Sequence, residues 1–158
     1  MTFEWKESPV PARAGDPVIL CVDDEPEVLN ALRRCFRNEP YRILTAGTPW
    51  EALVWMERTP GVDLVLLDQR MPGMSGTELM GVIRQRSPRT ARAVLSGHPS
   101  ELLIQKGLEA GAGAFFYKQW DDAVLRDTVR RLLSGKRRSP SVEEGDATKE
   151  FDLGGESG

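Results

Sequence analysis

The chain has 158 residues, of which 40% are hydrophobic and 28% charged, and its formal net charge is -3. This length suits one well-buried domain and is too short for two ordinary ones. A net charge this small and negative gives no positive electrostatic potential that would attract a polyanion, which argues against direct binding of nucleic acid. No apolar run is long enough to cross a bilayer and the first residues lack a secretory pattern, so we expect no membrane segment and a cytoplasmic protein.

The middle of the chain alternates between two kinds of pattern. Short apolar runs, beginning with residues 17–22, are typical of buried strands. After each run, apolar residues recur at the spacing of one helical face. In chain order the sequence predicts strands at 17–22, 41–45, 62–67, 91–95 and 113–117, and helices at 28–36, 48–58, 75–86, 99–110 and 121–133.

Three helix starts carry capping signals. Thr48 precedes a proline and has Glu51 three residues on, which predicts a capping box. Ser75 and Glu78 have the same spacing, and Asp121 suits the N-cap of the last helix. The five strand–helix repeats therefore predict an α/β fold in which helices cover both faces of a parallel sheet.

The two ends of the chain differ from its middle. Residues 1–16 show no sustained period, and we expect a flexible N-terminal segment. Residues 136–158 are acidic and poor in apolar side chains, which predicts a disordered tail. The folded domain is expected at 17–135, with Cys21 and Cys35 as reduced core thiols.

Polar side chains follow four of the predicted strands. Asp23 and Asp24 end the first strand, Asp68 the third, Ser96 the fourth and Lys118 the fifth. The carboxyl ends of parallel strands meet at one edge of a sheet, where such folds bind their ligands. We therefore expect three carboxylates, a hydroxyl and an ammonium to converge there.

Each of these residues also has a purely structural interpretation. Asp24 suits the N-cap of the first helix, with Glu27 as its capping-box partner. Asp68 suits a turn, Ser96 the start of a loop, and Lys118 a solvated position. Three clustered carboxylates are costly unless a cation neutralises them, however, and a hard cation such as Mg²⁺ prefers oxygen ligands.

The combination favours phosphoryl transfer. The transition state spreads negative charge over the phosphoryl oxygens, so catalysis consists mainly of positioning and electrostatics. Asp68 is the best nucleophile because it ends the most apolar strand. Asp24, supported by Asp23, would hold the metal, while Ser96 and Lys118 would contact phosphoryl oxygens.

At this point the sequence resembles the receiver domains of two-component response regulators, over about residues 17–134. The resemblance implies a flavodoxin-like, CheY-like fold with five parallel strands in the order 2-1-3-4-5 and five helices. It rests on five motifs in order: Val22-Asp-Asp-Glu-Pro26, Leu66-Leu-Asp-Gln-Arg-Met-Pro-Gly-Met-Ser-Gly76, Leu95-Ser-Gly97, Gly111-Ala-Gly-Ala-Phe115 and Tyr117-Lys118.

The resemblance also implies roles at the site. Asp68 would accept the phosphoryl group from a histidine kinase or a phosphotransfer protein. Asp24, Asp68 and the backbone carbonyl of Arg70 would hold Mg²⁺, with Asp23 assisting through water. Lys118 would pair with the phosphoryl group. Such a domain promotes its own phosphorylation and dephosphorylation and carries no separate enzyme activity.

Other positions would convert phosphorylation into a signal. Ser96 is implied as the switch hydroxyl, and Phe115 as the switch aromatic that repacks inward. Arg70 and His98 would tune the loss of the phosphoryl group. The surface of the fourth helix, fifth strand and fifth helix would then bind a downstream protein or a second copy of the chain.

One residue departs from the family pattern. Receivers usually have a proline, commonly in cis, after the lysine, and this chain has Gln119. A cis bond before a non-proline residue costs about 2.5–4 kcal/mol, so we expect a trans bond and a small shift of the loop.

Several alternatives remain open. The chain is expected to be a single-domain receiver, and a receiver cut from a longer protein is the alternative. A degenerate receiver would bind its partner without phosphorylation. A haloacid-dehalogenase-type phosphatase would need an acid where Arg70 stands. A flavin-binding protein would need a phosphate-cradling loop where Asp23 and Asp24 lie.

Overall fold

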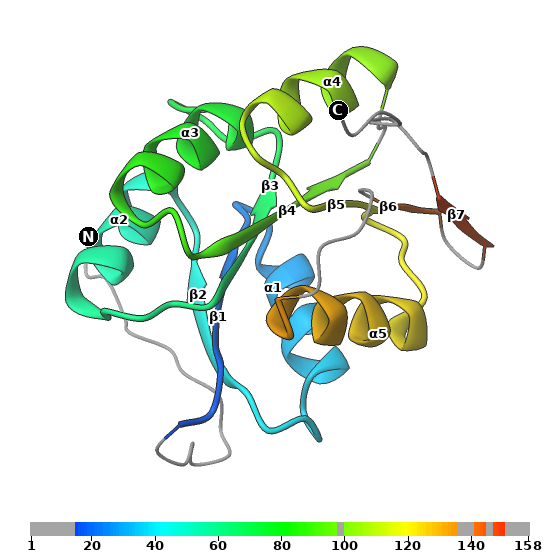
Figure 1. The fold of residues 1–158 in the computed structure, drawn as a ribbon, viewed down its shortest axis with the longest axis horizontal. Coiled ribbons are helices and arrows are strands. Elements are labelled where there is room, and N and C mark those ends of the chain that lie inside the picture. The colour runs from blue at the N-terminus through cyan, green and yellow to red at the C-terminus, as the bar shows by residue number, and fades with distance from the viewer. Residues whose placement is uncertain (1–14, 98–99, 136–140, 145–146, 151–158) are drawn as a thin grey trace.

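The computed structural model describes residues 15–97, 100–135, 141–144 and 147–150. Strands and helices alternate through the domain, as the sequence predicts (Figure 1). The first five strands are β1 (Val18–Val22), β2 (Arg42–Ala46), β3 (Leu64–Asp68), β4 (Ala91–Ser96) and β5 (Ala114–Tyr117). The helices are α1 (Pro26–Cys35), α2 (Pro49–Arg58), α3 (Gly76–Arg86), α4 (Glu101–Glu109) and α5 (Asp122–Leu133).

The first five strands are parallel and lie in the order β2-β1-β3-β4-β5. This confirms the predicted fold class and strand order. The central strand β3 is buried along its whole length, and it separates β1 from β4. Because the order reverses between β1 and β3, the sheet has its switch point beside the end of β3.

The sheet continues beyond β5, in a region that the sequence predicts to be disordered. Strand β6 (Ser141–Glu144) pairs in parallel with β5, and β7 (Ala147–Glu150) pairs antiparallel with β6 (Figure 1). The expectation of a disordered tail is therefore wrong for these two strands. Their backbone groups pair along the open edge of β5, a source of stability that needs few apolar side chains. The other tail residues and residues 1–14 lie outside the described residues.

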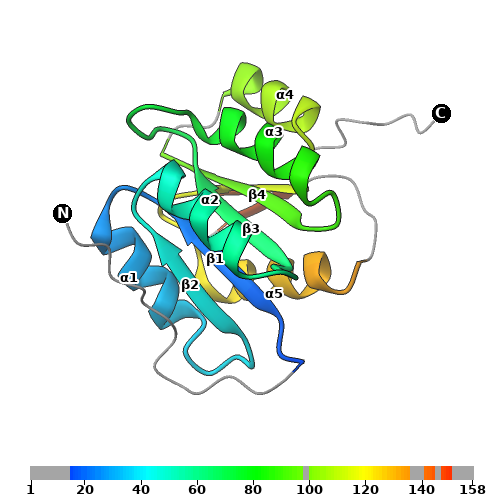
Figure 2. The ribbon, with the colours of Figure 1, turned by 90° about the vertical axis from the view of Figure 1, so that its left-hand side faces the viewer.

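Helices cover both faces of the sheet (Figure 2). Successive strand residues point to opposite faces, so Leu20 and Val22 pack with α2, α3 and α4, while Ile19 and Cys21 pack with α1 and α5. The two cores hold the molecule together on either side of β3. Their helical contributors are Ala52, Trp55, Leu79, Met80, Ile83 and Ile104 on one face and Leu32, Cys35, Leu125 and Val129 on the other.

The predicted caps are present at three helices. Ser75 and Glu78 form the expected reciprocal capping box at α3, and the Asp121 carboxylate accepts from Val124 N–H at α5. At α2 the Thr48 hydroxyl accepts from Glu51 N–H at 3.1 Å. The Glu51 side chain does not close the box there, because its carboxylate accepts from the backbone N–H one residue before Thr48.

The two cysteines are free and buried, as expected. Cys21 faces the α1 and α5 side of the sheet, and Cys35 ends α1 on that same side. Burial raises the pKa of each thiol to about 12, so both are unreactive core groups at neutral pH. Among the described residues, no helix combines the length and the apolarity that a membrane crossing needs.

Candidate functional site

The register of the sheet brings the predicted site residues to one edge. Val22 of β1 is paired in register with Leu67 of β3. Asp23, the residue after β1, and Asp68, the last residue of β3, therefore lie side by side at the carboxyl ends of these strands. Lys118 follows β5 directly, and its backbone N–H donates to the carbonyl of Ser96 at the end of β4. Four separate strand ends therefore meet at one place.

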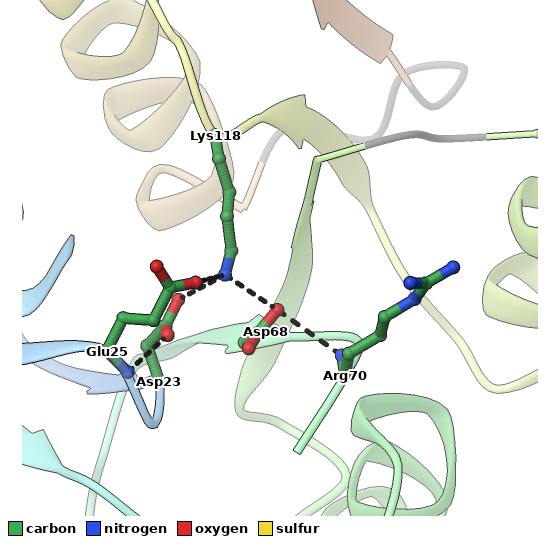
Figure 3. A network of polar contacts seen from close by, with 5 residues as sticks. All are labelled: Asp23, Glu25, Asp68, Arg70 and Lys118. Atoms are coloured by element: carbon green, nitrogen blue, oxygen red, sulfur yellow. Dashed lines mark hydrogen bonds and ion pairs between the residues drawn. The ribbon is translucent and has the colours of Figure 1, made fainter.

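Lys118 links the carboxylates that gather there (Figure 3). Its Nζ lies 3.3 Å from Asp23 Oδ2 and 3.3 Å from Asp68 Oδ1. A third carboxylate, that of Glu25, is closer, with 2.6 Å between Oε1 and Nζ. The side chains of Asp23 and Asp68 are almost inaccessible, whereas that of Glu25 is 57% exposed. One ammonium thus partly neutralises two buried carboxylates and one exposed one.

Burial shifts the protonation of the acidic pair. Burial and, to a smaller extent, the neighbouring charge of Asp23 together raise the pKa of Asp68 to about 7, against the opposing effect of Lys118. Burial likewise raises the pKa of Asp23. For Lys118 burial lowers the pKa, but the hydrogen bond to Glu25 and the charges of Asp23 and Asp68 outweigh it, so the pKa lies above its usual value. The cluster holds more negative charge than one lysine can balance.

Carboxylate oxygens at this edge suit a divalent cation. Asp23 Oδ2 and Asp68 Oδ2 are buried and lack hydrogen bonds within the described part of the chain, although the former lies near Lys118. Carboxylate oxygens of Asp23, Asp24 and Glu25 lie within 4.8 Å of one another. These are the hard oxygen ligands that Mg²⁺ prefers. The acidic residues that gather at this edge therefore fit a magnesium ion by the chemistry of their oxygens.

A cavity of about 370 Å³ opens beside the Asp68 carboxylate. The predicted residues Asp24, Asp68, Ser96 and Lys118 all line it. Arg70 lines it too, and its backbone N–H donates to Asp68 Oδ1 at 3.3 Å. The space has room for a small anion such as a phosphoryl group, with cationic and hydroxyl groups around it.

Two glycines shape the loop that follows Asp68. Gly73 has a φ of +89°, a left-handed conformation that favours glycine. At Gly76 any β-carbon would collide with the backbone carbonyl oxygen of Asp68. The loop is further tied by Thr77, whose hydroxyl donates to the Gln69 side chain at 2.7 Å. This close packing fixes the backbone on which the Asp68 carboxylate is carried.

Phe115 is already buried in this structure, with an exposed fraction of 1%. Its ring packs on α4 over Gly107, where the absence of a side chain leaves room for it. The ring is therefore already inward in this structure, and the inward repacking during signalling stays a prediction. A phenylalanine has no hydroxyl group that would favour an exposed position.

The loop after β5 agrees with the sequence. The described residues contain no cis peptide bond, so the Lys118–Gln119 bond is trans, as predicted. The Lys118 ammonium nevertheless reaches both Asp23 and Asp68. His98, predicted to tune the site, lies outside the described residues.

The structure adds one residue that the sequence did not single out. Glu25 is the N-cap residue of α1, yet its side chain makes no capping hydrogen bond. It reaches Lys118 instead. The interpretation of Asp24 as the cap of α1 is therefore wrong. One sequence feature could have pointed to Glu25: it is a glutamate at an N-cap position, where serine, threonine, aspartate or asparagine is usual.

Comparison with known proteins agrees with this geometry. Residues 19–130 match the family model of the response regulator receiver domain. Among solved structures, the signal receiver domain of an HD domain-containing protein from Pseudomonas fluorescens is similar. It has a TM-score of 0.73 and 32% identity, over 76% of this chain and 96% of that one.

Two curated relatives differ in how much of them the chain covers. The hydrogenase transcriptional regulatory protein HoxA of Cupriavidus necator is 40% identical over 75% of this chain, but the match covers 24% of HoxA. The sporulation initiation phosphotransferase F of Bacillus subtilis is 32% identical over 73% of this chain, and the match covers 92% of that protein. The chain therefore spans about a quarter of one relative and nearly all of the other.

Proposed function

The chain belongs to the response regulator receiver domain family, and we propose that it accepts a phosphoryl group on Asp68 from a histidine kinase or a phosphotransfer protein. The position of Asp68 carries this proposal. Its buried carboxylate ends β3, with Oδ1 3.3 Å from Lys118 Nζ, and among the described residues Oδ2 has no hydrogen-bond partner. A nucleophile with an unshared oxygen, an adjacent cation and an open cavity meets the needs of phosphoryl transfer.

In the transfer, an oxygen of the Asp68 carboxylate forms a bond to phosphorus while the bond from phosphorus to the donor's histidine nitrogen breaks. The electron pair of that bond stays on the nitrogen, which takes up a proton as the imidazole leaves. The Lys118 ammonium pairs with one phosphoryl oxygen, and the Ser96 hydroxyl donates to another. These contacts neutralise charge that the transition state spreads over the oxygens.

Asp24, Asp68 and the backbone carbonyl of Arg70 would hold Mg²⁺, with Asp23 assisting, and the ion would supply positive charge beside the phosphoryl oxygens. The residues themselves keep the group in place, and the same arrangement promotes hydrolysis of the aspartyl phosphate by water. Arg70, which lines the cavity, and His98 would set how readily water reaches the phosphorus.

The signal leaves through the surface of α4, β5 and α5. When Asp68 gains phosphoryl oxygens, the Ser96 hydroxyl moves toward them and the end of β4 follows. Because Phe115 is already buried beneath α4, we propose that α4 itself carries the change. A downstream protein or a second copy of the chain would bind that surface. HoxA is named as a transcriptional regulatory protein, and we propose transcription as the output of the pathway downstream of this receiver.

Intact-protein mass tests this function. The chain is incubated with Mg²⁺ and acetyl phosphate, and we expect wild type to gain one phosphoryl group. Asp68→Ala should gain none. Asp63→Ala is the matched control. Asp63 immediately precedes β3, at the end of the strand opposite to Asp68, and its carboxylate accepts a hydrogen bond from Val18 N–H. A folded wild-type chain that gains no phosphoryl group would favour a degenerate receiver that binds its partner without phosphorylation.

A further inference from the structure

The nearest partner of the Lys118 ammonium is not the acceptor. Glu25 Oε1 lies 2.6 Å from Nζ, whereas the closest oxygens of Asp68 and Asp23 are both 3.3 Å away (Figure 3). Only the contact to Glu25 is a short, charge-assisted hydrogen bond. The Lys118 ammonium, which a phosphorylated Asp68 would need as its counter-ion, therefore has its closest contact with Glu25.

Helix capping does not explain the presence of Glu25. In α2, α3, α4 and α5 the N-cap side chain accepts a hydrogen bond from the helix backbone. In α1 the N-cap is Glu25, and its side chain makes no such bond. A poor N-cap in place of a good one lowers helix stability. The side chain turns to Lys118, so its one specific contact in the described structure lies at the site.

The backbone of Glu25 fixes this geometry. Its N–H donates to Asp23 Oδ1 at 2.8 Å, which leaves Asp23 Oδ2 on the side of Lys118. Glu25 also lines the same cavity as Asp68 and Lys118. A phosphoryl group on Asp68 would extend into that cavity and place its negative charge beside the Glu25 carboxylate.

We propose that Glu25 is a positioning residue that competes with the phosphorylated acceptor for the Lys118 ammonium and so weakens the hold on the phosphoryl group. The inference rests on the function proposed above. The ammonium has three donors, but its position 2.6 Å from Glu25 Oε1 leaves it 3.3 Å from Asp68 Oδ1. While Lys118 stays with Glu25, the phosphoryl group loses part of its countercharge. Glu25 would thus limit the stability of the phosphorylated state.

The test is the affinity for beryllofluoride, the probe with which a related receiver was activated for structure determination. Binding is followed by ¹⁹F NMR at saturating Mg²⁺, established separately for each variant. Glu25→Gln keeps the length of the side chain and removes its charge, and we expect it to bind beryllofluoride about two- to fivefold more tightly. Glu27→Gln removes a charge from the same turn of α1 and should leave the affinity near that of wild type.

A double-mutant cycle separates the competition from a general charge effect. In a Lys118→Gln background, Glu25→Gln should change the affinity no more than Glu27→Gln does. Equal or weaker binding by Glu25→Gln in the native background would overturn this inference alone, as would a full effect that persists without Lys118. A wild-type chain that binds no beryllofluoride would overturn the proposed function together with this inference.

Discussion

The ring of Phe115 occupies the space in which a side chain at Gly107 would lie. A β-carbon built on Gly107 would be 2.6 Å from both Cε1 and Cζ of that ring. Gly107 belongs to α4 and Phe115 to β5, two elements of the surface through which we propose that the signal leaves. Their contact joins the helix to the strand, so the position of α4 depends on the packing of one aromatic ring.

Replacing Gly107 by alanine should therefore destabilise the domain. In an exposed helix this change gains up to about 1 kcal/mol, but here the added methyl group overpacks the core, which costs about 1–3 kcal/mol. Chemical denaturation measures the difference. Gly81→Ala in α3 is the matched control, because no atom lies within 4 Å of its β-carbon, and it should be neutral or stabilising.

Shortening Phe115 should restore part of the stability that Gly107→Ala loses. Phe115→Leu removes the ring atoms that the new methyl group would meet. The double variant of Gly107→Ala and Phe115→Leu should then lose less unfolding free energy than the two single variants lose together. Strict additivity would show that the two side chains do not compete for one space.

The raised pKa of Asp68 gives a pH dependence with a definite sign. Its pKa is about 7 in the folded chain and about 4 in an unfolded one. Between these values the folded state holds a proton that the unfolded state has lost, so stability falls as pH rises. In the absence of Mg²⁺, the stability of Asp68→Asn relative to wild type should increase between pH 4 and 7, by up to about 4 kcal/mol. A stability difference that stays constant across this range would contradict the burial effect.

Lys118 should be required for stability at neutral pH. Its removal leaves the buried carboxylates of Asp23 and Asp68 without their cation, and breaking such a pair costs about 3–5 kcal/mol when it is fully buried. Lys118 is 19% exposed, so we expect Lys118→Gln to lose about 1–3 kcal/mol in urea denaturation. Lys106→Gln, which removes a lysine from α4, should change stability by less than about 0.5 kcal/mol. Equal stability of the two variants would show that Lys118 does not compensate the acidic pair.

Magnesium should raise the thermal stability of the wild-type chain. A ligand that binds only the folded state stabilises it by an amount that grows with the logarithm of the ligand concentration above Kd. We expect millimolar Mg²⁺ to raise Tm in wild type and much less in Asp24→Asn, because that change removes one of the clustered carboxylates. Asp127→Asn, which removes an exposed carboxylate from α5, should keep the full response. The same response in all three chains would point to non-specific binding.

Much of this fold follows from local patterns. The run Leu64–Asp68 is apolar up to its last residue and forms the buried central strand, because only apolar side chains tolerate contact on both faces of a sheet. The Ser75 and Asp121 caps are also local, since each serves a backbone N–H three residues on. Once the strand ends were known, the meeting of Asp23, Asp68 and Lys118 followed from the parallel topology.

Other features depend on contacts that no local pattern contains. Glu25 reaches Lys118 across 93 residues of sequence, and nothing beside Glu25 shows which way its side chain turns. The burial of Phe115 depends on Gly107, a residue on a different element. Strands β6 and β7 form by backbone pairing at the edge of β5, which composition does not reveal. Side-chain contacts between residues distant in the sequence, and strand pairing at the edge of the sheet, are thus what the sequence alone does not predict.

The central claim is that Asp68 carries the phosphoryl group, and chemical trapping tests it most directly. Borohydride reduces an aspartyl phosphate to homoserine, and trypsin then releases residues 59–70, whose only carboxylate side chains are those of Asp63 and Asp68. After treatment of the chain with acetyl phosphate and Mg²⁺, fragmentation of this peptide should locate homoserine at position 68. Homoserine at position 63, at another carboxylate such as Asp24, or at no position in the folded chain would contradict the claim.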